Sequence, residues 1–349
     1  MTAESPSQSQ SVTIRDVAAR VGVAVSTVSR ALRNERCISV ARREAVQATA
    51  KELGYRPNPL VSALMAQVRP KRHAHHPVAV AILDCFPRGQ RSFSEDYERA
   101  IHQRAEAFGY RIESLRLEDL VPRRRLDRVL DARGIRGLIV LPVPVHVELE
   151  GVSYERLAAA TVDPSLKRPH MHRASADYFQ GMTAALTRLV ALGCTRIGFV
   201  TATTEVARIG DLWLAAFLLW QSKLPTTQRL AVHMPQQDSV AAFRAWLRRE
   251  QPDAIVSNMR HPFDWLPAAG VRCPRDLVYA HLNVRAEWPA AGIDQHHEQV
   301  AWAAFDLVVS QLNRNEYGLP ATPQTVLIEG TWSDGPTALW GRKHDLTAP

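Results

Sequence analysis

The chain has 349 residues, of which 46% are hydrophobic and 22% are charged, which is enough for a small domain and a larger body with its own core. Its net charge of +8 is unevenly placed, because residues 1–76 hold 12 Lys and Arg against 5 Asp and Glu and the rest is nearly balanced. The longest apolar run, nine residues from Leu212 to Trp220, excludes a membrane-spanning helix. Four cysteines with no close pair indicate a reduced, cytoplasmic protein.

The N-terminal stretch begins with a polar segment and continues with a short amphipathic helix. Residues 1–11 are rich in Ser and Gln, so we expect a disordered leader. Thr13 and Asp16 have the spacing of a capping box, which predicts a helix that starts at Thr13. Its apolar positions follow the i, i+3, i+4, i+7 pattern and are Ile14, Val17, Ala18 and Val21. Gly22 can take a positive φ, and it predicts the end of this helix and a tight turn.

Two more helices are predicted after this turn. The second begins at about Val25, places Val28 and Leu32 inward and presents hydroxyl and guanidinium side chains outward. The third has Ser39 as its N-cap and ends at about Leu53. Two short helices joined by a tight turn, with a cationic second helix, predict a helix-turn-helix that binds DNA. The positive charge of the same segment suits contacts with phosphates.

A break at two prolines, Pro57 and Pro59, precedes a segment that cannot fold alone. Residues 58–69 have a short apolar periodicity, and a helix of this length is marginal in water, so we expect a hinge helix that needs a second copy or a DNA groove. Residues 70–77 form a basic linker with three histidines. These histidines have no carboxylate or cysteine nearby and no fixed geometry, so we predict no metal site.

The segment from Val12 to Asn58 carries an ordered run of motifs. They are Val12-Thr-Ile-Arg-Asp-Val-Ala18, Gly22-Val23, Ser26-Thr-Val-Ser-Arg-Ala-Leu32, Asn34, Ile38-Ser39, Arg43 and Leu53-Gly-Tyr-Arg-Pro-Asn58. In this spacing they resemble the DNA-binding head of the lactose-repressor (LacI/GalR) family of bacterial transcription regulators. The resemblance implies a nucleoid-associated repressor that binds a pseudo-palindromic double-stranded operator as a homodimer.

The resemblance also implies roles for individual residues of the head. The residues matching the family positions that read base edges are Val25, Ser26 and Arg30, of which Arg30 can donate two hydrogen bonds to guanine. The residues placed to hold phosphates are Thr13, Thr27, Ser29, Ser39, Arg43 and Asn58. The hinge residues expected in the minor groove are Ser62, Leu64 and Met65, with Leu64 aligned with the family's leucine wedge.

From Val78 the pattern changes to alternating strands and helices. Residues 78–83 form a continuous apolar run, which is typical of a strand buried on both faces. The same unit recurs, with helices predicted over 97–108, 124–132, 178–192 and 240–250 and strands over 110–117, 137–141, 196–200 and 253–256. Alternation of this kind predicts parallel sheets covered by helices, and the length of this part predicts two lobes with a cleft between them.

This body is similar to the effector-binding core of the same family, which shares its fold with periplasmic sugar-binding proteins. The matching segments are Asp177-Tyr-Phe-Gln-Gly181, Leu192-Gly-Cys-Thr-Arg-Ile-Gly198, Gly292-Ile-Asp-Gln295 and Gly335-Pro-Thr337. The expected fold is therefore an all-α head over 12–57 and an α/β two-lobe, periplasmic-binding-protein-like core over 78–340. Crossovers between the lobes are expected near 173, 293 and 326, and 341–349 is expected to be a tail.

The cleft is where we expect a small-molecule effector. Ligands of open parallel sheets lie beyond the carboxyl ends of the strands, so the loops after Leu83, Leu141, Val200 and Val256 are predicted to line the cleft. The polar candidates for effector contact are Arg208, Asp84, Asn258, Asn283 and His297. Four tryptophans at helical positions are expected in the core rather than stacked on a sugar: Trp213, Trp220, Trp246 and Trp302.

By resemblance the effector is a sugar or a sugar derivative, but the sequence departs from the family at the predicted pocket. Ala280-His-Leu-Asn283 stands where the family commonly has Gly-Tyr/Phe-Asp-Asp, so the carboxylate that often grips sugar hydroxyls is replaced. The Asn-Asp pair expected after Val256 is present only as Ser257-Asn258-Met259. The alternative that remains open is a DNA-binding regulator without a small-molecule effector, controlled by a protein partner or by its own level.

No catalytic pattern accompanies these features. The sequence contains no G-x-S-x-G, no H-E-x-x-H and no G-x-x-x-x-G-K-[ST], and His296, His297 and Glu298 are adjacent, so their side chains diverge. We therefore expect no enzymatic activity and no cofactor.

Overall fold

The computed structural model describes residues 12–32, 38–55, 78–89, 94–120, 124–236, 239–285, 287–288 and 290–339. The expected leader (1–11), hinge helix (58–69), linker (70–77) and tail (341–349) therefore lie outside the described residues. The chain divides into two compact units, one over Met1–Val78 and Val309–Tyr317 and the other over Ala79–Val308 and Gly318–Pro349. Within the described ranges, no helix is both long and apolar enough to cross a membrane.

The first unit contains three short helices, α1 (Ile14–Val21), α2 (Val25–Leu32) and α3 (Val40–Glu52). All three pack against one another around a small core made of Val17, Ala18, Val28, Ala31, Val46 and Ala50. The carboxylate of Asp16 accepts hydrogen bonds from the backbone N–H and the hydroxyl of Thr13, both at 2.7 Å. These bonds lower the pKa of Asp16 and fix the start of α1. Gly22, at φ 70°, ends α1 in the left-handed conformation, which confirms the predicted turn.

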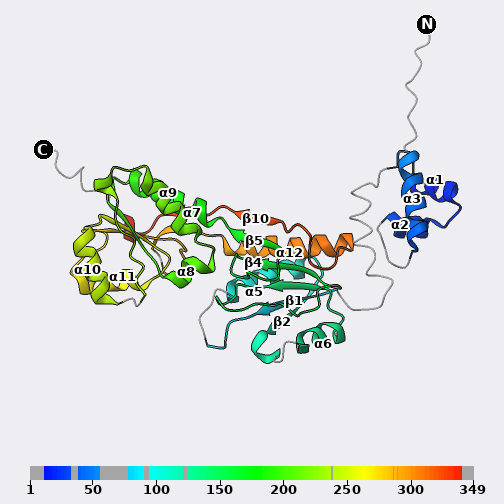
Figure 1. Cartoon of the computed structure of the whole chain (residues 1–349), viewed down its shortest axis with the longest axis horizontal. Helices are drawn as coiled ribbons and strands as arrows, with labels where there is room; N and C mark the ends of the chain where they lie inside the picture. The colour runs from blue at the N-terminus through cyan, green and yellow to red at the C-terminus, as the bar shows by residue number, and fades with distance from the viewer. Residues whose placement is uncertain are drawn as a thin grey trace, which may run out of the picture. The chain divides into compact units, whose positions relative to one another are not determined.

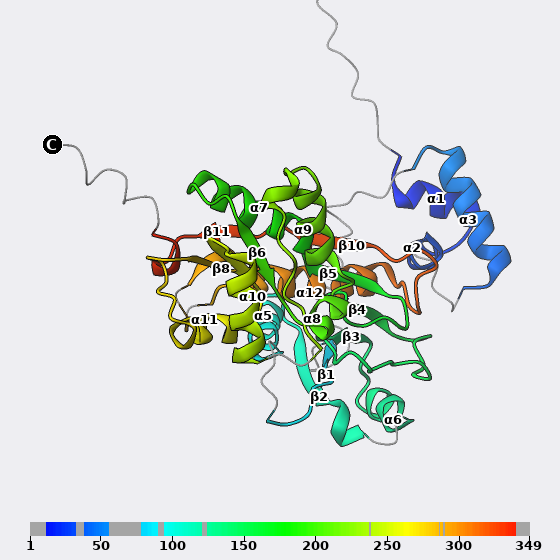
Figure 2. The same cartoon turned by 60° about the vertical axis from the view of Figure 1, so that its left-hand side comes forward.

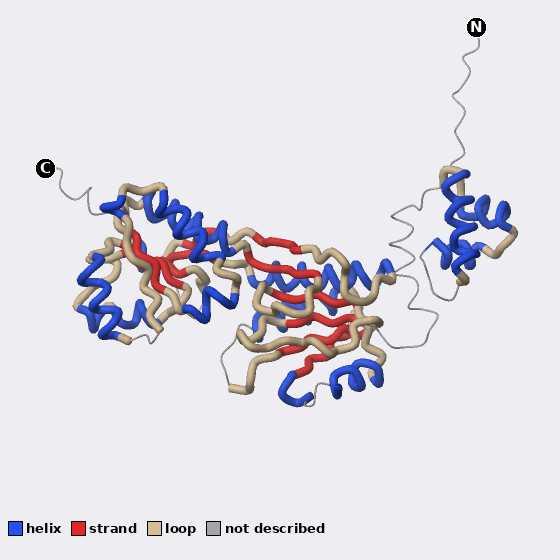
Figure 3. Tube along the Cα trace, viewed as in Figure 1, coloured by secondary structure: helices blue, strands red, loops and turns tan. Residues whose placement is uncertain are grey.

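The second unit holds two sheets, each forming the centre of one lobe (Figures 1 and 3). The first lobe has six parallel strands in the order β10-β5-β4-β3-β1-β2. Their bounds are β1 Ala79–Asp84, β2 Arg111–Arg116, β3 Gly137–Val140, β4 Ala158–Val162, β5 His172–Ala176 and β10 Thr325–Ile328. Its helices are α5 (Ser94–Ala107), α6 (Arg124–Ala132) and α12 (His297–Arg314), of which the part up to Val308 belongs to this unit.

The burial of strand β1 shows that the sheet of this lobe is covered on both faces. All six of its residues are buried, as its unbroken apolar run predicts. On one face Leu83 belongs to the same core cluster as Leu126 of α6. On the other face the side chains of Val80 and of Val308 in α12 meet over Gly137 of β3. Helices therefore cover both faces of the first sheet.

The second lobe has five strands in the order β11-β9-β8-β7-β6, parallel except for β11, which is antiparallel to β9. Their bounds are β6 Ile197–Val200, β7 Ala254–Ser257, β8 Val278–His281, β9 Ala291–Asp294 and β11 Thr331–Ser333. The helices are α7 (Tyr178–Ala191), α8 (Thr203–Arg208), α9 (Leu212–Ser222), α10 (Val240–Glu250) and α11 (His261–Trp265). Figures 1 and 2 show α7 and α9 side by side, away from α10 and α11.

The chain passes between the two sheets three times. It leaves the first sheet after Ala176 of β5, returns through α12 after Asp294 of β9, and crosses again between Ile328 of β10 and Thr331 of β11. Among the described residues, short 3-10 helices lie at Leu117–Leu120, Thr226–Gln228, Pro267–Ala269 and Pro336–Ala338. The two-lobe α/β fold class expected from the sequence is confirmed.

Several predicted boundaries need correction. The helix expected to begin at Tyr97 begins three residues earlier, at Ser94. The sequence pattern misses this first turn, because Ser94, Glu95 and Asp96 are polar and carry no apolar periodicity. Strands β4 and β5 were not predicted from the sequence. Ala158–Val162 consists mostly of alanine, and His172–Ala176 begins with two polar residues, so neither has the composition of a strong strand.

Gly292 offers a test of the pairing between β8 and β9. It pairs with His281, has φ 151°, and an added Cβ would lie 1.9 Å from the backbone oxygen of His281. We expect Gly292→Ala to destabilise the core by roughly 3 kcal/mol or more, because backbone must move to admit the methyl group. Thermal or urea unfolding of the purified protein measures this loss.

The matched control is Gly270→Ala. Gly270 also has a positive φ, 76°, but nothing lies within 4 Å of its added Cβ. Only the left-handed backbone is then penalised, at about 1 kcal/mol. Equal losses for the two variants would contradict the close approach of β9 to β8.

Candidate functional site

The exposed face of α2 carries the three residues predicted to read bases. Val25 is 41% exposed although it is apolar, and Ser26 and Arg30 are also exposed. Val28 and Ala31 of the same helix are buried. One face of α2 therefore holds the core of the first unit, and the other presents a methyl-rich, a hydroxyl and a guanidinium side chain to the surroundings.

The residues predicted to contact phosphates lie on the three helices of the same unit. Thr13 and Ser39 are exposed and directly precede α1 and α3, while Thr27, Ser29 and Arg43 are half-buried on α2 and α3. The remaining predicted DNA contacts lie outside the described residues: Asn58, Ser62, Leu64 and Met65.

The second unit contains a narrow polar cavity that brings together four of the five predicted effector residues: Arg208, Asn258, Asn283 and His297. The other residues that line it are Tyr97, Asp163, Tyr178, Glu205, Trp213 and Gln295. The cavity measures about 20 Å³, which is room for about one water molecule. Its own side chains fill the cleft in this conformation.

The lining residues follow the carboxyl ends of strands from both lobes. Asp163 follows β4 of the first lobe, and Asn258, Asn283 and Gln295 follow β7, β8 and β9 of the second. Glu205 and Arg208 lie on α8 after β6. The segment after β3, which was expected to line the cleft, contributes no lining residue to this cavity. Its place is taken by Asp163 at the end of the neighbouring strand.

Arg208 and Asp163 form a buried ion pair across the two lobes. The guanidinium Nη1 of Arg208 is 2.5 Å from the Oδ2 of Asp163, and the side chains are only 11% and 2% exposed. The carboxylate also accepts the backbone N–H of Ser165 at 2.6 Å. Burial acts to lower the pKa of Arg208, but Asp163, Tyr178 and Glu205 together outweigh it and the pKa is raised. Arg208 is therefore charged, and its guanidinium is held against the carboxylate of Asp163.

Two neutral imidazoles fix Asn283. Its backbone N–H donates to Nδ1 of His281 at 2.9 Å, and its Oδ1 is 2.7 Å from Nε2 of His297. Burial lowers the pKa of His281 to about 3 and that of His297 to about 4, so both rings are uncharged near pH 7. Since an amide oxygen only accepts, Nε2 of His297 carries the hydrogen.

Aromatic rings close the cavity. Tyr97 of α5 packs against His297 with ring centroids 4.9 Å apart, and Tyr178 meets Trp213 edge-to-face at 5.0 Å. Burial raises the pKa of both tyrosines, so their hydroxyls stay protonated. Trp213 is buried at 3% exposure, as a core residue would be, and its side chain also reaches the cavity.

A second ion pair between the lobes lies beside this cavity. Nη1 of Arg285, in the loop after β8, is 2.5 Å from Oδ2 of Asp96 on α5. Lys167 adds a third link, because its ammonium donates to the backbone oxygen of Arg208 at 3.2 Å. The lobes are thus joined by several polar contacts of the chain itself.

The structure does not bring Asp84 to the cavity. Its carboxylate accepts the N–H of Phe86 at 3.0 Å and the hydroxyl of Ser94 at 3.1 Å, and it lies 3.3 Å from Arg116. Asp84 therefore anchors the start of α5 and the edge strand β2. Conversely, Asp163 and Tyr97 escaped the sequence analysis. Asp163 follows an unrecognised strand, and Tyr97 was read only as a helical position.

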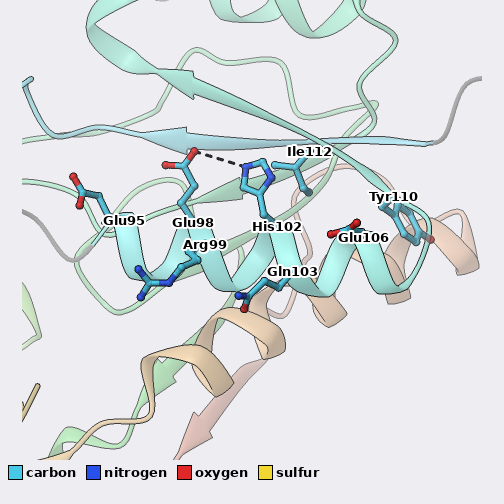
Figure 4. Close-up of a pocket in the computed structure, with 8 residues that line it drawn as sticks. All are labelled: Glu95, Glu98, Arg99, His102, Gln103, Glu106, Tyr110 and Ile112. Atoms are coloured by element: carbon cyan, nitrogen blue, oxygen red, sulfur yellow. Dashed lines mark ion pairs between the residues drawn. The ribbon is translucent and has the colours of Figure 1, made fainter. Parts of the chain in front are cut away.

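A different hollow runs along the outer side of α5 and is open to solvent. Figure 4 shows its lining, which consists of Glu95, Glu98, Arg99, His102, Gln103, Glu106, Tyr110 and Ile112. The one ion pair drawn there joins Glu98 and His102 at 3.8 Å, with 28% and 48% of their side chains exposed. Such solvated groups do not form a catalytic constellation. Among the described residues, no group of three or more His, Cys, Asp or Glu could hold a metal ion.

Two family models match this chain. The model of bacterial regulatory proteins of the lacI family matches residues 13–58, which include α1 to α3. The model of the periplasmic binding protein-like domain matches residues 186–337, which include most of the second lobe and strands β10 and β11. The two matches fall in the order that the sequence motifs predict.

Curated relatives match over part of their length. The HTH-type transcriptional regulator GalS of Salmonella typhimurium is 51% identical over 57 residues, 16% of this chain and 17% of that protein. The HTH-type transcriptional repressor CytR of Escherichia coli is 27% identical over 210 residues, 57% of this chain and 56% of that protein. The matches thus span about a sixth and just over half of these two relatives.

Solved structures share the fold at low sequence identity. A transcriptional regulator CelR in complex with cellobiose has a TM-score of 0.57 at 19% identity, covering 93% of this chain and 99% of that one. The lac repressor dimer bound to operator and the anti-inducer ONPF has a TM-score of 0.54 at 18% identity, covering 95% and 100%. Residues 13–58 are thus similar to bacterial regulatory proteins of the lacI family, and residues 186–337 to periplasmic binding protein-like domains.

Proposed function

We propose that this protein is a sequence-specific DNA-binding transcription regulator that represses its target by occupying a pseudo-palindromic operator. The observation that carries this proposal is α2, which presents Val25, Ser26 and Arg30 on the exposed face of a lacI-family three-helix unit. An exposed helix of this width fits the major groove, where Arg30 can donate to guanine and Val25 can contact a thymine methyl group.

The proposal includes a homodimer, because two heads are needed to read two half-sites. The lac repressor, which shares this fold, is described as a dimer bound to its operator. In our proposal residues 58–69 form the hinge helix, and Leu64 inserts between base pairs at the centre of the operator. The protein would act in the cytoplasm, at the nucleoid.

The cleft is proposed as the site of a small-molecule effector, with Arg208, Asn258, Asn283 and His297 as contacts. Its supporting feature is the convergence of hydrogen-bonding side chains from both lobes between buried aromatic rings. An effector would change operator affinity only as far as it binds the open and closed lobes differently. The cavity of about 20 Å³ favours an alternative, a regulator whose closed cleft takes no effector and which responds to a protein partner or to its own level.

Arg30 and Arg43 provide the first test of the DNA interface. On an operator selected from genomic fragments, Arg30→Ala should relax the preference at one base position in each half-site, by roughly 1–3 kcal/mol. Arg43→Ala should weaken binding to all sequences alike and reduce the slope of log affinity against log salt. Binding titrations against a set of single-base operator variants, at three salt concentrations, measure both effects. An unchanged base preference in Arg30→Ala would remove Arg30 from base readout.

Leu64 tests the hinge. Leu64→Ala should weaken binding to the operator by about 2 kcal/mol or more and leave binding to random DNA nearly unchanged, because only the operator is kinked by the wedge. Leu64→Met is the control, since it keeps a long apolar side chain. Equal losses on operator and random DNA would show that Leu64 has no role as a wedge.

A further inference from the structure

Helix α9 of the second lobe presents an apolar side to solvent. None of its 11 residues, Leu212–Ser222, is charged. Trp213 and Phe217 are buried in the lobe, whereas Leu218 and Leu219 are 46% and 50% exposed. A helix on the surface of a monomeric protein normally carries charged residues on its outer side. Helix α9 therefore has the composition of a helix that is covered when the protein assembles.

The neighbouring helix α7 extends this surface, because the two helices pack side by side (Figure 2). The hydroxyls of Thr183 and Thr187 on α7, and of Ser222 on α9, donate to carbonyl oxygens of their own helices at 2.8–2.9 Å. These hydroxyls need no water, so the side chains add mainly apolar surface. We name the exposed, uncharged residues that follow the α7–α9 face: Thr183, Thr187, Val190, Ala215, Leu218, Leu219 and Ser222.

A membrane surface does not suit the α7–α9 face. Helices that lie on membranes carry Lys and Arg along their polar side, which binds anionic lipids. Helices α7 and α9 hold a single charged residue between them, Arg188, and its guanidinium lies 3.4 Å from the carboxylate of Asp334. The face therefore suits another protein surface.

The two ends of α9 carry opposite charges that suit a second copy of this chain. Asp211 directly precedes the helix and Lys223 directly follows it, and both are exposed. A helix of this length spans about 16 Å. If two copies of α9 pack antiparallel with Phe217 at the centre, Asp211 of each copy lies opposite Lys223 of the other. The same two-fold arrangement sets Ala215 opposite Leu219 of the other copy, a small residue against a large one.

The charges at the ends of α9 are not used within the chain. Asp211 lies near Lys167, but the ammonium of Lys167 donates to the backbone oxygens of Pro164 and Arg208. Among the described residues, neither Asp211 nor Lys223 forms a salt bridge. Both charges can therefore pair across an interface.

We propose that two dimers of this protein join through their α7–α9 faces, with the α9 helices of two chains packed antiparallel, and that the resulting tetramer holds two operators at once. The α9 contact lies on the second lobe, whereas the head is joined to the chain ahead of β1 in the first lobe. The operator and the dimer that binds it belong to the proposed function. Assembly through α9 needs no DNA, so the two can fail independently.

The test is the assembly state of the full-length protein without DNA, measured by sedimentation velocity at about 10 μM, where weak specific interfaces are populated. We expect a tetramer for the wild type and a dimer for Leu218→Glu/Leu219→Glu. In this variant two carboxylates from each copy would face each other at the contact, so the affinity between dimers should fall at least about hundredfold.

Leu327→Glu is the matched control. Leu327 is 53% exposed, as much as the leucines of α9, but it lies on β10 of the first lobe. This variant also replaces an exposed leucine by a carboxylate, and it should remain tetrameric.

A second pair of variants tests the antiparallel register. Lys223→Glu sets a carboxylate opposite Asp211 of the other copy and should weaken the association of dimers about fivefold. Asp211→Asn in the same chain removes the opposing charge and should restore the affinity to within about twofold of the wild type. Asparagine is chosen because residue 211 has φ 60°, which asparagine tolerates. A partner other than a second copy would give no such recovery.

The outcomes that overturn the proposal are distinct. They are a wild type that is monomeric or dimeric at this concentration, and a folded Leu218→Glu/Leu219→Glu that stays tetrameric or falls to monomers. If circular dichroism shows that this variant does not fold, Lys223→Glu and Asp211→Asn/Lys223→Glu decide, and loss without recovery contradicts the antiparallel pair.

Operator binding is measured separately on the same samples. The wild-type tetramer should hold two differently labelled operator duplexes in one complex, whereas Leu218→Glu/Leu219→Glu should bind one duplex with unchanged affinity. A dimeric wild type that still recognises its operator affects the α9 contact alone. Loss of operator specificity in the wild type affects the proposed function and leaves the measured assembly state as it is.

Discussion

The ion pair of Asp163 and Arg208 is the interaction on which the arrangement of the second unit most depends. It joins the end of a strand in the first lobe to the end of a helix in the second, and neither side chain has much access to water. A buried charge without its partner is strongly destabilising. If the two lobes separate at this point, water must therefore reach both side chains and replace the lost ion pair. Whatever contacts Asp163 and Arg208 in the cleft therefore also affects the spacing of the two lobes.

This linkage gives the proposed regulation a physical basis. Each lobe is built on its own sheet, and the three chain crossings between the lobes are short, so a change at the cleft can move one lobe against the other. A compound that satisfies Asp163 and Arg208 while wedging between them would favour a different spacing from the one they adopt alone. Operator affinity would follow only if the heads bind DNA differently in the two spacings.

Much of the fold was predictable from local patterns, and the reasons are specific. A few residues are enough to predict three features: the capping box of Thr13 and Asp16, the turn at Gly22 and the buried strand β1. Strands β4 and β5 could not be recognised, because alanine and polar residues gain strand character only from their neighbours in the sheet. Helix α12 is long and continuous, but the passage of the chain from β9 of the second lobe to this helix could be expected only from the family resemblance.

The cleft was predicted in part for a related reason. Topology places residues after strands at one edge of a sheet, and so Asn258, Asn283 and His297 were correctly expected to lie near one another. The partner of Arg208 was not predictable, because Asp163 follows β4, whose alanine-rich sequence does not predict a strand. Asp84 also follows a strand, yet its carboxylate is used by Phe86, Ser94 and Arg116. Position after a strand brings a residue close to the cleft, and its local hydrogen bonds decide whether it faces the ligand.

The most direct test of this account is selection of binding sites from fragmented DNA of the protein's own source, followed by sequencing of the retained fragments. We expect enrichment of a pseudo-palindrome with two half-sites related by two-fold symmetry and an easily kinked central step. Fragments retained without any shared sequence, and released uniformly as salt is raised, would contradict it, because such binding needs only the basic charge of the head and no readout by α2.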